Sequence, residues 1–334
     1  MKVKIIGSGS AGNHIANAFS KLPVNIVQTD LDLPSLNRSK FKIYIKRYKK
    51  WPRNISQQVE KLRDNQFYDA IIISTPPASH FNLLKKHLKY SNLFIIEKPI
   101  CEPNKVSIKK FKEIIKKNKE KVFLCGYNHR LFPSTLLLRK LVKKNFFKID
   151  QINVNFKENT EGFLKAHSWY KSLSESYLSN SNIGGGSLCE HSHGLNLGQY
   201  LIGDKSEIKL LDKNLSWYKK NKCNYDSNAE LLFKYKDKFL KVHQNFTTNP
   251  TEKNVKIFGK KIYIELTYNY KNSDDKLLLV QNNKKKVYLF QKTRADDFKY
   301  EAKYIYDFLT KNKTVNILDA NFAIKTIEQI NKLF

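Results

Sequence analysis

Near its start the chain places a glycine-rich turn between a strand candidate and a helix candidate, VKIIGSGSAGNHIANAF. Gly7, Gly9 and Gly12 give the spacing G-x-G-x-x-G. In such a unit the first glycine permits a tight turn, the second lets a pyrophosphate approach the backbone, and the third lets helix and strand pack closely. The free amide groups of the helix N-terminus then face the phosphates. This pattern predicts a dinucleotide-binding fold, and an ordinary strand-turn-helix without a ligand is the alternative.

An acidic residue ends the next strand candidate. VNIVQTD finishes at Asp30, 18 residues past Gly12, near the spacing of about 20 residues at which a carboxylate accepts from the adenosine ribose hydroxyls. Asp30 and Asp32 would repel a 2′-phosphate, so we predict NAD as the cofactor and consider NADP the less favoured one. Arg38 and Lys40 lie close enough in sequence to keep NADP as an alternative.

Apolar strand candidates alternate with amphipathic helix candidates up to residue 126. The helices are SQQVEKLRDN, HFNLLKKHLKY and SIKKFKEIIKKN, and the strands are DAIIIST, NLFIIEKP and VFLCGYN. This alternation predicts a parallel sheet with both faces covered, whose ligands bind beyond the carboxyl ends of the strands. The residues expected to contact the cofactor are Gly7, Ser8, Gly9, Ser10, Ala11, Gly12, Asp30, Ser74, Thr75, Pro76, His80, Glu97 and Lys98.

Residues 127–334 show a different pattern. Closely spaced strand candidates joined by short polar turns predict an antiparallel sheet. They are QINVNFKE, AELLFKYKDKFLKVHQNF, VKIFGKKIYIELTY, LLLVQNN and KVYLFQ, and two helix candidates follow, DDFKYEAKYIYDFLTKN and ANFAIKTIEQINKLF. We therefore expect an α/β chain with a doubly wound Rossmann domain over 1–126 and an α/β domain with a large, mostly antiparallel open sheet over 127–334. The C-terminal helix can pack back on the first domain.

The formal net charge of +31 raises nucleic-acid binding as an alternative function. The lysines are scattered in short groups along the whole chain, which favours a lysine-rich solvated surface over one basic stripe. No apolar run approaches the roughly 20 residues that span a membrane, and the first residues lack signal-peptide features. The four cysteines form no C-x-x-C pair, so we expect reduced thiols in a cytoplasmic protein with no nucleic-acid or membrane partner.

The stretch GGGSLCEHSHGLN, residues 184–196, brings Cys189, Glu190, His191 and His193 together in sequence. These are zinc-ligand types, yet on a helix Glu190 and His193 share a face without His191, and on a strand the two histidines share a face without Glu190. A structural glycine turn is a second alternative. We favour proton transfer with no metal, since oxidation of a secondary alcohol needs a base whose pKa is near the working pH. The glycines would let the backbone approach a ligand and turn into a helix.

Together, G-x-G-x-x-G, STPPASH, EKP, GYNHR and the GGG…H run resemble the glucose-fructose oxidoreductase and inositol dehydrogenase family, Gfo/Idh/MocA, over nearly the whole chain. The resemblance implies a nicotinamide-dependent oxidoreductase of sugars, cyclitols or nucleotide-linked sugars, with a place in surface polysaccharide sugar biosynthesis. It also implies a homodimer or homotetramer formed through the second-domain sheet. A sensor or scaffold that binds NAD or a sugar without turnover is the alternative.

By position, the resemblance implies that Lys98 holds the reacting hydroxyl and that His193 takes or gives its proton. Many members have aspartates where this chain has Cys189 and Asn196, so we expect Glu190 to be the acid that holds the histidine ring. The candidate substrate contacts are Tyr127, Asn128, Arg130, His167, Trp169, Tyr177, His191 and Asn196. Trp169 and Tyr177 are equally compatible with plain core packing.

Overall fold

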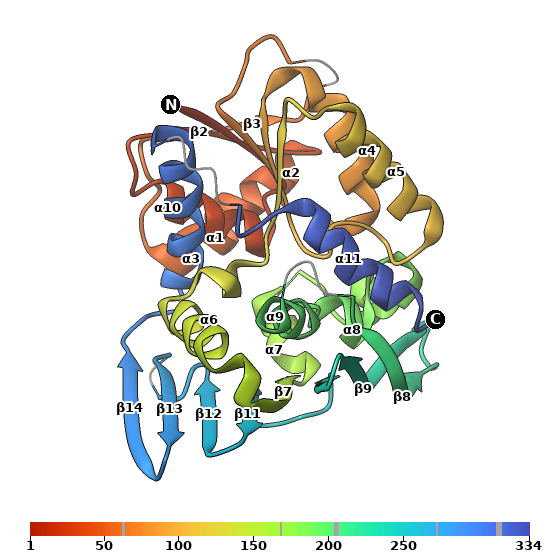
Figure 1. The fold of residues 1–334 in the computed structure, drawn as a ribbon. Coiled ribbons are helices and arrows are strands. Elements are labelled where there is room, and N and C mark those ends of the chain that lie inside the picture. The colour runs from red at the N-terminus through yellow and green to blue at the C-terminus, as the bar shows by residue number, and fades with distance from the viewer. Residues whose placement is uncertain (62–63, 168, 204–206, 272, 312–315) are drawn as a thin grey trace. The chain divides into compact units, whose positions relative to one another are not determined.

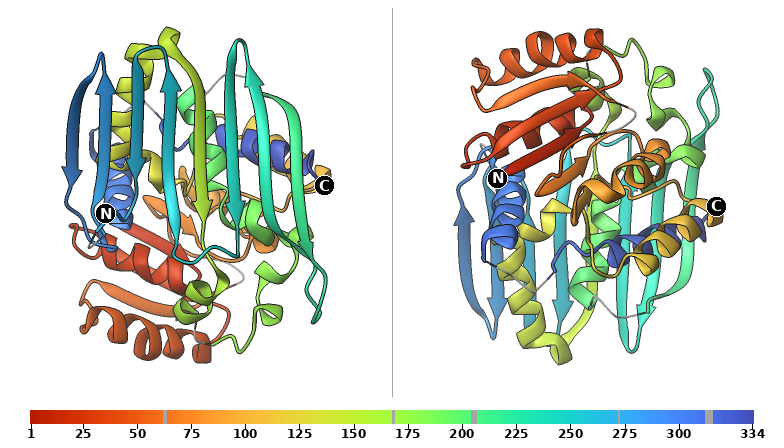
Figure 2. Two further views of the ribbon diagram at one scale, coloured as in Figure 1. Left: turned by 90° about the horizontal axis from the view of Figure 1, so that it is seen from below. Right: turned by 90° about the horizontal axis from the view of Figure 1, so that it is seen from above.

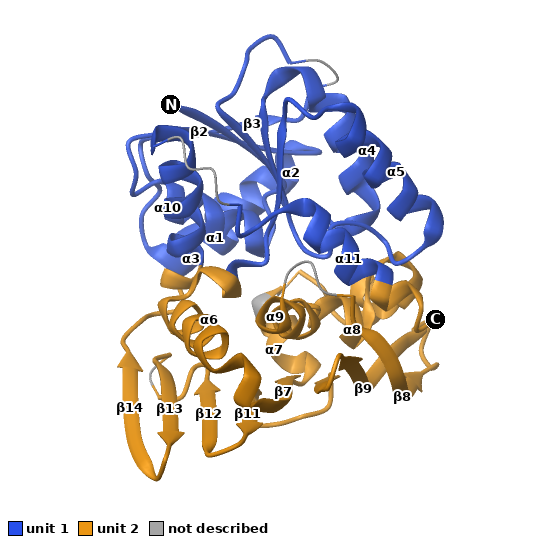
Figure 3. Cartoon of the chain, in the orientation of Figure 1, with its two compact units in different colours: residues 1–128, 298–328 blue, residues 129–297, 329–334 orange. Residues whose placement is uncertain are grey.

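The computed structural model describes residues 1–61, 64–167, 169–203, 207–271, 273–311 and 316–334 (Figure 1). The chain forms two compact units, shown in different colours in Figure 3. Unit 1 comprises residues 1–128 and 298–328, and unit 2 comprises residues 129–297 and 329–334. The first crossing from one unit to the other therefore lies two residues beyond the boundary expected from the sequence, and the C-terminal region returns to unit 1.

Unit 1 is built on a six-stranded sheet in the order β3-β2-β1-β4-β5-β6. The strands are β1 (Lys2–Ile6), β2 (Asn25–Asp30), β3 (Ile55–Val59), β4 (Ala70–Ile73), β5 (Leu93–Ile96) and β6 (Val122–Cys125). Neighbouring strands run parallel throughout. The order reverses between β1 and β4, so their carboxyl ends flank the switch point where doubly wound sheets bind ligands. The predicted Rossmann sheet is confirmed.

Every residue of β4 and β5 is buried, because helices cover both faces of this sheet. The α-helices of this part of the chain are α1 (Ser10–Phe19), α2 (Leu33–Asn37), α3 (Ile45–Tyr48), α4 (Pro77–His87), α5 (Lys105–Lys117), α10 (Asp296–Lys311) and α11 (Ala320–Asn331). A π-helical segment, Arg38–Tyr44, joins α2 to α3. The sequence analysis did not predict the helical stretch from α2 to α3.

One predicted helix of unit 1 is wrong. SQQVEKLRDN was expected to be helical, but its start belongs to strand β3, which pairs in parallel with β2; residues 62 and 63 lie outside the described part. Ile55 is buried and the rest of β3 is partly exposed, as befits an edge strand. Backbone pairing with β2 therefore decides the conformation over a weak local helix propensity.

A buried charged cluster fixes the chain that follows β3. Lys4, in the middle of β1, is 1% exposed, and its Nζ lies 3.0 Å from a carboxylate oxygen of Glu60 and 2.5 Å from one of Asp64. His87 Nε2 lies 2.7 Å from Glu60, which also accepts from the Thr29 hydroxyl. Burial alone would raise the pKa of Glu60, but these hydrogen bonds and the Lys4 charge outweigh it and lower that pKa. The cluster joins the edge of the sheet to α4.

Unit 2 contains an eight-stranded sheet in the order β14-β13-β12-β11-β7-β10-β9-β8 (Figure 2). The strands are β7 (Ile149–Lys157), β8 (Lys209–Tyr218), β9 (Tyr225–Tyr235), β10 (Lys238–Asn245), β11 (Glu252–Gly259), β12 (Ile262–Thr267), β13 (Asp275–Gln281) and β14 (Lys284–Phe290). Only the β7–β10 pairing among these strands is parallel, so the predicted large, mostly antiparallel open sheet is confirmed. The edge strand β8 was not predicted, because its residues are mostly exposed and lack apolar alternation.

Helices pack on one face of this second sheet. They are α6 (Pro133–Asn145), α7 (Thr160–Ala166), α8 (Gly186–Glu190) and α9 (His193–Ile202). Helix α6 packs on β12 and β13, α8 packs on β9, and α9 packs on β7 and β10. Along β12, buried Ile262, Ile264 and Leu266 alternate with partly exposed residues. No helix in the described ranges of the chain is both long and apolar enough to cross a bilayer.

Candidate active site

The glycine turn of unit 1 leaves an open space in front of α1. Gly7 has a φ of +102°, and a Cβ on it would lie 2.5 Å from the Ser74 carbonyl oxygen. A Cβ on Gly12 would lie 2.1 Å from the Gly7 oxygen, so both positions require glycine. A Cβ on Gly9 would meet nothing within 4 Å, and no side chain caps α1. The first amide groups of the helix are therefore available to an anion such as a pyrophosphate.

Two polar side chains hold this turn from the protein side. Ser74 Oγ donates at 3.1 Å toward the carbonyl oxygens of Ile6 and Gly7, at the carboxyl end of β1. Asn13 is fully buried and donates from Nδ2 to the oxygens of Ser8 at 2.7 Å and Gly9 at 2.9 Å. The sequence analysis assigned Ser74 to the cofactor site and missed Asn13, whose one signal is a polar side chain directly after the third glycine.

Asp30 lies beside the turn, at the end of β2. Its Oδ2 accepts from the backbone N–H of Ser8 at 2.8 Å and from the Ser8 hydroxyl at 2.5 Å, and its Oδ1 accepts from the Leu31 N–H at 2.8 Å. A carboxylate has about four acceptor sites, two on each oxygen, so Oδ1 keeps capacity for a further donor. The residues therefore fit a dinucleotide, with the pyrophosphate at α1 and a ribose hydroxyl at Asp30.

Arg47 of α3 is a second cofactor candidate that the sequence analysis missed. Its Nη2 donates to the hydroxyl of Ser10, the first residue of α1, at 3.3 Å. Its Nη1 is buried and has no hydrogen-bond partner among the residues that the structure describes. The guanidinium thus lies beside the uncapped helix N-terminus, where an anion would be bound. No sequence signal reveals this, because the approach depends on the bend between α2 and α3.

His80, expected to contact the cofactor, is fully buried. Its Nδ1 lies 3.1 Å from the Ile100 oxygen and its Nε2 lies 2.7 Å from the Thr75 oxygen. Burial lowers the pKa of this imidazole. Since both ring nitrogens face backbone carbonyls, the histidine supports the turn after β4, and its share in cofactor binding would be indirect. Pro76, in the same turn, is the N-cap residue of α4.

The Glu97-Lys98-Pro99 turn follows β5. The Glu97 N–H donates to the Ile73 oxygen at 2.9 Å, and its Oε2 accepts from the Lys98 N–H at 3.2 Å. A Cβ on Gly126 would lie 3.0 Å from the Glu97 carboxyl carbon, so glycine leaves room for that carboxylate. Parallel strands end at one edge of their sheet, and unit 1 therefore places Lys98 at the same edge as the glycine turn.

The triple glycine of unit 2 is required by the chain's own packing. Gly184 and Gly186 have φ values of +92° and +76°. A Cβ on Gly185 would lie 2.3 Å from the Tyr177 oxygen, and one on Gly186 would lie 1.9 Å from a carboxylate oxygen of Asp226. The close approach that the glycines permit is therefore to protein atoms at the start of α8, where the sequence analysis expected a ligand.

Asp226 of β9 anchors the start of α8, and the sequence analysis did not find it. Its Oδ1 accepts from the Ser181 hydroxyl at 2.6 Å, and its Oδ2 accepts from the Ser187 hydroxyl at 2.8 Å and the Leu188 N–H at 2.7 Å. Burial raises the pKa of this carboxyl to about 6, although the three hydrogen bonds oppose the rise. The carboxylate fixes the helix that leads to Glu190.

Glu190 and His193 do not share a helix. Helix α8 ends at Glu190 and α9 begins at His193, with a turn between them. The Tyr177 hydroxyl donates to Glu190 Oε2 at 3.0 Å, which brings two predicted site residues together. His191 is buried, and its ring lies 5.3 Å from that of Phe246.

The ring of His193 lies 4.3 Å from that of His129, measured between centroids. His129 in turn packs against the rings of Phe132 at 4.8 Å, Phe156 at 5.3 Å and Tyr268 at 5.5 Å. The sequence analysis named both neighbours of His129 in GYNHR and missed the histidine itself. Within unit 2 the predicted base therefore lies beside a second imidazole that apolar rings hold in place.

The predicted substrate contacts fall into buried and partly exposed groups. Tyr127, Asn128, Arg130 and Asn196 are buried, and the Arg130 guanidinium lies over the Tyr200 ring at 4.2 Å. All four side chains are therefore enclosed by other atoms of the protein.

The partly exposed group is aromatic. His167 stacks on Phe163 at 3.9 Å and lies 5.0 Å from Trp169. Tyr177 packs against the buried cluster that contains Leu178. Trp169 and Tyr177 thus take part in packing and keep exposed surface, so both interpretations of them stand.

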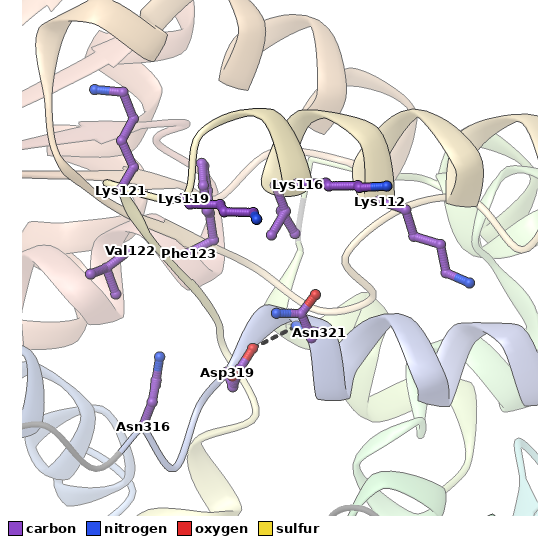
Figure 4. A pocket seen from close by; sticks show the side chains of 10 residues that line it. Lys112, Lys116, Lys119, Lys121, Val122, Phe123, Asn316, Asp319 and Asn321 are labelled. Atoms are coloured by element: carbon purple, nitrogen blue, oxygen red, sulfur yellow. Dashed lines mark hydrogen bonds between the residues drawn. The ribbon is translucent and has the colours of Figure 1, made fainter.

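Among the described residues no group of three or more His, Cys, Asp and Glu side chains could hold a metal ion. The four cysteines are buried thiols without a disulfide between them. A separate hollow of about 460 Å³ lies between α5 and the start of α11 (Figure 4). Of its lining lysines, Lys112 pairs with Glu328, and Lys121 donates to Ser91 and Asn92. It contains no predicted site residue.

Residues 1–127 match the model of an oxidoreductase family with an NAD-binding Rossmann fold, GFO_IDH_MocA. No curated protein sequence matches the chain. Solved structures share the fold of the whole chain. Levoglucosan dehydrogenase in complex with NADH and L-sorbose is 14% identical, with a TM-score of 0.77 over 100% of this chain and 97% of its own.

Two further structures resemble the chain. KijD10, a 3-ketoreductase from Actinomadura kijaniata in complex with NADP and TDP-benzene, is 9% identical, with a TM-score of 0.76 over 99% of this chain and 96% of its own. Aldose-aldose oxidoreductase from Caulobacter crescentus, complexed with glycerol, is 13% identical, with a TM-score of 0.76 over 100% and 96%. Residues 1–127 thus match the NAD-binding unit of the Gfo/Idh/MocA oxidoreductases, in agreement with the resemblance that the sequence motifs indicate.

Proposed function

We propose that the protein is an NAD-dependent oxidoreductase that transfers a hydride between nicotinamide and a secondary alcohol or ketone of a sugar, cyclitol or nucleotide-linked sugar. The observation that carries this proposal is the uncapped N-terminus of α1 behind an open Gly9, with the Asp30 carboxylate bonded beside it. Sugar-active proteins with the same fold support the substrate class. Cytoplasmic location, a homo-oligomer formed through the unit 2 sheet, and a role in surface polysaccharide sugars are parts of the same proposal.

NAD is the proposed cofactor because Asp30 would repel a 2′-phosphate. Asp30→Ser should weaken NAD binding and relatively improve NADP binding. Titration of each dinucleotide into parent and variant, followed by calorimetry, measures the ratio of the two affinities. Tighter binding of NADP by the parent would contradict the assignment.

The proposed chemistry divides between Lys98 and His193. The bound nicotinamide accepts or gives the hydride. The Lys98 ammonium would stabilise negative charge on the substrate oxygen, and the His193 imidazole would take or give the hydroxyl proton. Glu190, held by the Tyr177 hydroxyl, would orient the histidine. These roles rest on the family positions of the residues.

The test is the appearance of NADH, or its consumption, with a panel of free sugars, cyclitols, sugar acids and nucleotide-linked sugars. His193→Ala should lower turnover by roughly 10²–10⁴-fold and keep dinucleotide affinity. Lys98→Ala should also lose turnover while the exposed control Lys105→Ala keeps it. Parental turnover in both His193→Ala and Lys98→Ala would contradict the assigned roles.

A non-catalytic sensor or scaffold remains the competing function. Stoichiometric dinucleotide binding with no hydride transfer to or from any compound of the panel would support it. Binding of DNA or RNA that weakens steeply with salt would instead support the nucleic-acid alternative.

A further inference from the structure

An ion pair of unit 2 lies near the two histidines of the candidate active site. Lys253 Nζ lies 2.6 Å from Glu158 Oε2, and the side chains of the lysine and the glutamate are 16% and 33% exposed. Burial alone would raise the pKa of Glu158, but the charge of Lys253 and the hydrogen bond from its ammonium group outweigh it and lower that pKa. The pair thus consists of an ammonium group and a carboxylate that both keep exposed surface.

The pairing of the strands places Lys253 next to His129. Lys253 of β11 is opposite Phe156 of β7, and its carbonyl oxygen accepts from the N–H of Tyr268, just past β12, at 2.9 Å. Opposite residues on neighbouring strands point to the same face of a sheet. Phe156 faces α9, because a Cβ on Gly194 would lie 3.3 Å from its ring. The ring of His129 lies 5.3 Å from that of Phe156 and 5.5 Å from that of Tyr268, so Lys253 lies between the two aromatic residues that contact this histidine.

The ion pair and the histidines have the same degree of access to solvent. The rings of His129 and His193 are 4.3 Å apart between centroids. Like Glu158 and Lys253, both histidines are partly exposed, whereas the aromatic rings of the sheet below them are buried. Unit 2 therefore presents imidazole, ammonium and carboxylate groups together above a floor of buried aromatic rings.

A structural role explains little of this ion pair. Partly exposed ion pairs contribute little to folding stability, and the backbones of β7 and β11 are already paired along their length. The charges are also balanced, because Lys253 neutralises Glu158, and Arg294, whose charge also acts on Glu158, pairs with Asp297 at 2.8 Å. Such a pair suits a ligand that both donates and accepts hydrogen bonds and has no net charge.

We propose that Lys253 and Glu158 are specificity-determining residues that bind adjacent hydroxyl groups of a neutral sugar or cyclitol ring whose reacting carbon lies at His193. A hydroxyl group both donates and accepts, so one hydroxyl accepts from the Lys253 ammonium while its neighbour donates to the Glu158 carboxylate. Because the two charged groups are in contact, hydroxyls on neighbouring carbon atoms reach both at once. A sugar acid gains no net attraction here, since Glu158 repels the charge that Lys253 attracts. This inference rests on the proposed function and narrows its substrate class.

The experiment compares the parent with Glu158→Gln, Lys253→Met and the control Glu265→Gln. Glu265 lies 3.8 Å from Lys256 in a similarly exposed ion pair of the same sheet, and Lys256 points to the face opposite Lys253 because it is three residues further along β11. The probes are cyclitols and matched pairs of a neutral sugar and its uronic acid, such as glucose and glucuronate. Saturation-transfer NMR measures their affinities without any need for turnover.

The parent should bind the neutral member of a pair more tightly than the acid. Lys253→Met should weaken the neutral ligands by about tenfold, because a hydrogen bond to a charged group is lost. Glu158→Gln leaves the Lys253 charge unpaired, so the affinity for the acid relative to the neutral sugar should rise by about tenfold, whereas Glu265→Gln should keep the parental ratio.

Turnover of the same compounds separates this inference from the proposed function. A parental ratio of affinities in Glu158→Gln, a preference of the parent for acids, or the absence of binding by every probe would overturn the role of the ion pair. Turnover combined with a parental ratio in Glu158→Gln would overturn that role and leave the oxidoreductase function in place. Binding with the expected change of ratio but without turnover would support the ion pair and contradict the proposed reaction.

Discussion

Asp226→Asn removes the charge of the buried acid that anchors α8 and keeps the size of the side chain. In the folded protein burial raises the pKa of Asp226 to about 6, against 3.8 for an exposed aspartate. The difference is roughly two units, and each unit corresponds to about 1.4 kcal/mol, so ionisation of this group costs the folded state about 3 kcal/mol.

The sign of the pH dependence follows from which state binds the proton more tightly. Because the folded pKa is the higher one, the folded state binds a proton between about pH 6 and pH 4 that the unfolded state has released. The Asp226 contribution therefore stabilises the fold as the pH falls through this window. Asp226→Asn lacks this titration. The unfolding free energy of the parent, relative to that of the variant, should therefore rise by about 3 kcal/mol as the pH falls from 7 to 3.5.

A second effect of the same substitution does not depend on pH. The carboxylate accepts from Ser181, Ser187 and Leu188 through two oxygens, whereas an asparagine side chain has one oxygen and an amide that needs its own acceptor. At least one donor loses its partner, which costs about 1–3 kcal/mol. This offset lowers the stability of the variant at every pH and leaves the slope unchanged.

Urea unfolding at several pH values between 7 and 4, followed by far-ultraviolet circular dichroism, measures the difference in unfolding free energy. Asp150→Asn, at an exposed position of β7, is the matched control and should show no such slope. The reasoning is refuted if the difference in unfolding free energy between parent and Asp226→Asn is the same at every pH. It is also refuted if the parent becomes less stable relative to the variant as the pH falls.

Three further outcomes are expected. Arg47→Ala should weaken the binding of NAD and of ADP-ribose by about tenfold each, while the exposed control Lys46→Ala should leave both affinities unchanged. Calorimetric titration measures these affinities, and an unchanged affinity in Arg47→Ala would show that Arg47 does not contact the dinucleotide. Lys4→Met should lower the unfolding free energy by about 3–5 kcal/mol because it removes the buried cation that pairs with both Glu60 and Asp64, and urea unfolding would show a smaller loss if the cluster admits water. His129→Phe keeps the ring packing and removes the imidazole beside His193, so turnover on the sugar panel should fall by less than about tenfold if His193 alone transfers the proton.

Features set by neighbouring residues were predictable from the sequence. The spacing of Gly7, Gly9 and Gly12 after an apolar strand predicted the turn and the Rossmann sheet, because Gly7 and Gly12 are required by atoms of the same strand-turn-helix unit or of Ser74 after the adjacent strand. The alternating residues of β9 to β14 predicted an antiparallel sheet for a similar reason, since hairpin partners are close in sequence.

Features set by distant residues were not predictable. The β3 segment is a strand because β2 offers a free edge, and β8 is a strand because β9 does, although neither has an apolar pattern of its own. Asp226 meets Ser181 across 45 residues, and Arg47 meets Ser10 across 37. One sequence contains no signal for such pairs, since each partner alone has the pattern of an ordinary surface residue.

The buried acid that anchors α8 also bears on the pH dependence of turnover. Asp226 is an ionised acceptor at neutral pH and takes a proton near pH 6. Acidification therefore alters the anchor of α8, the helix that ends at Glu190. A loss of turnover near pH 6 then has two sources, protonation of His193 and protonation of Asp226. The pH–rate profile of Asp226→Asn separates them, because only the limb that belongs to the histidine survives in that variant.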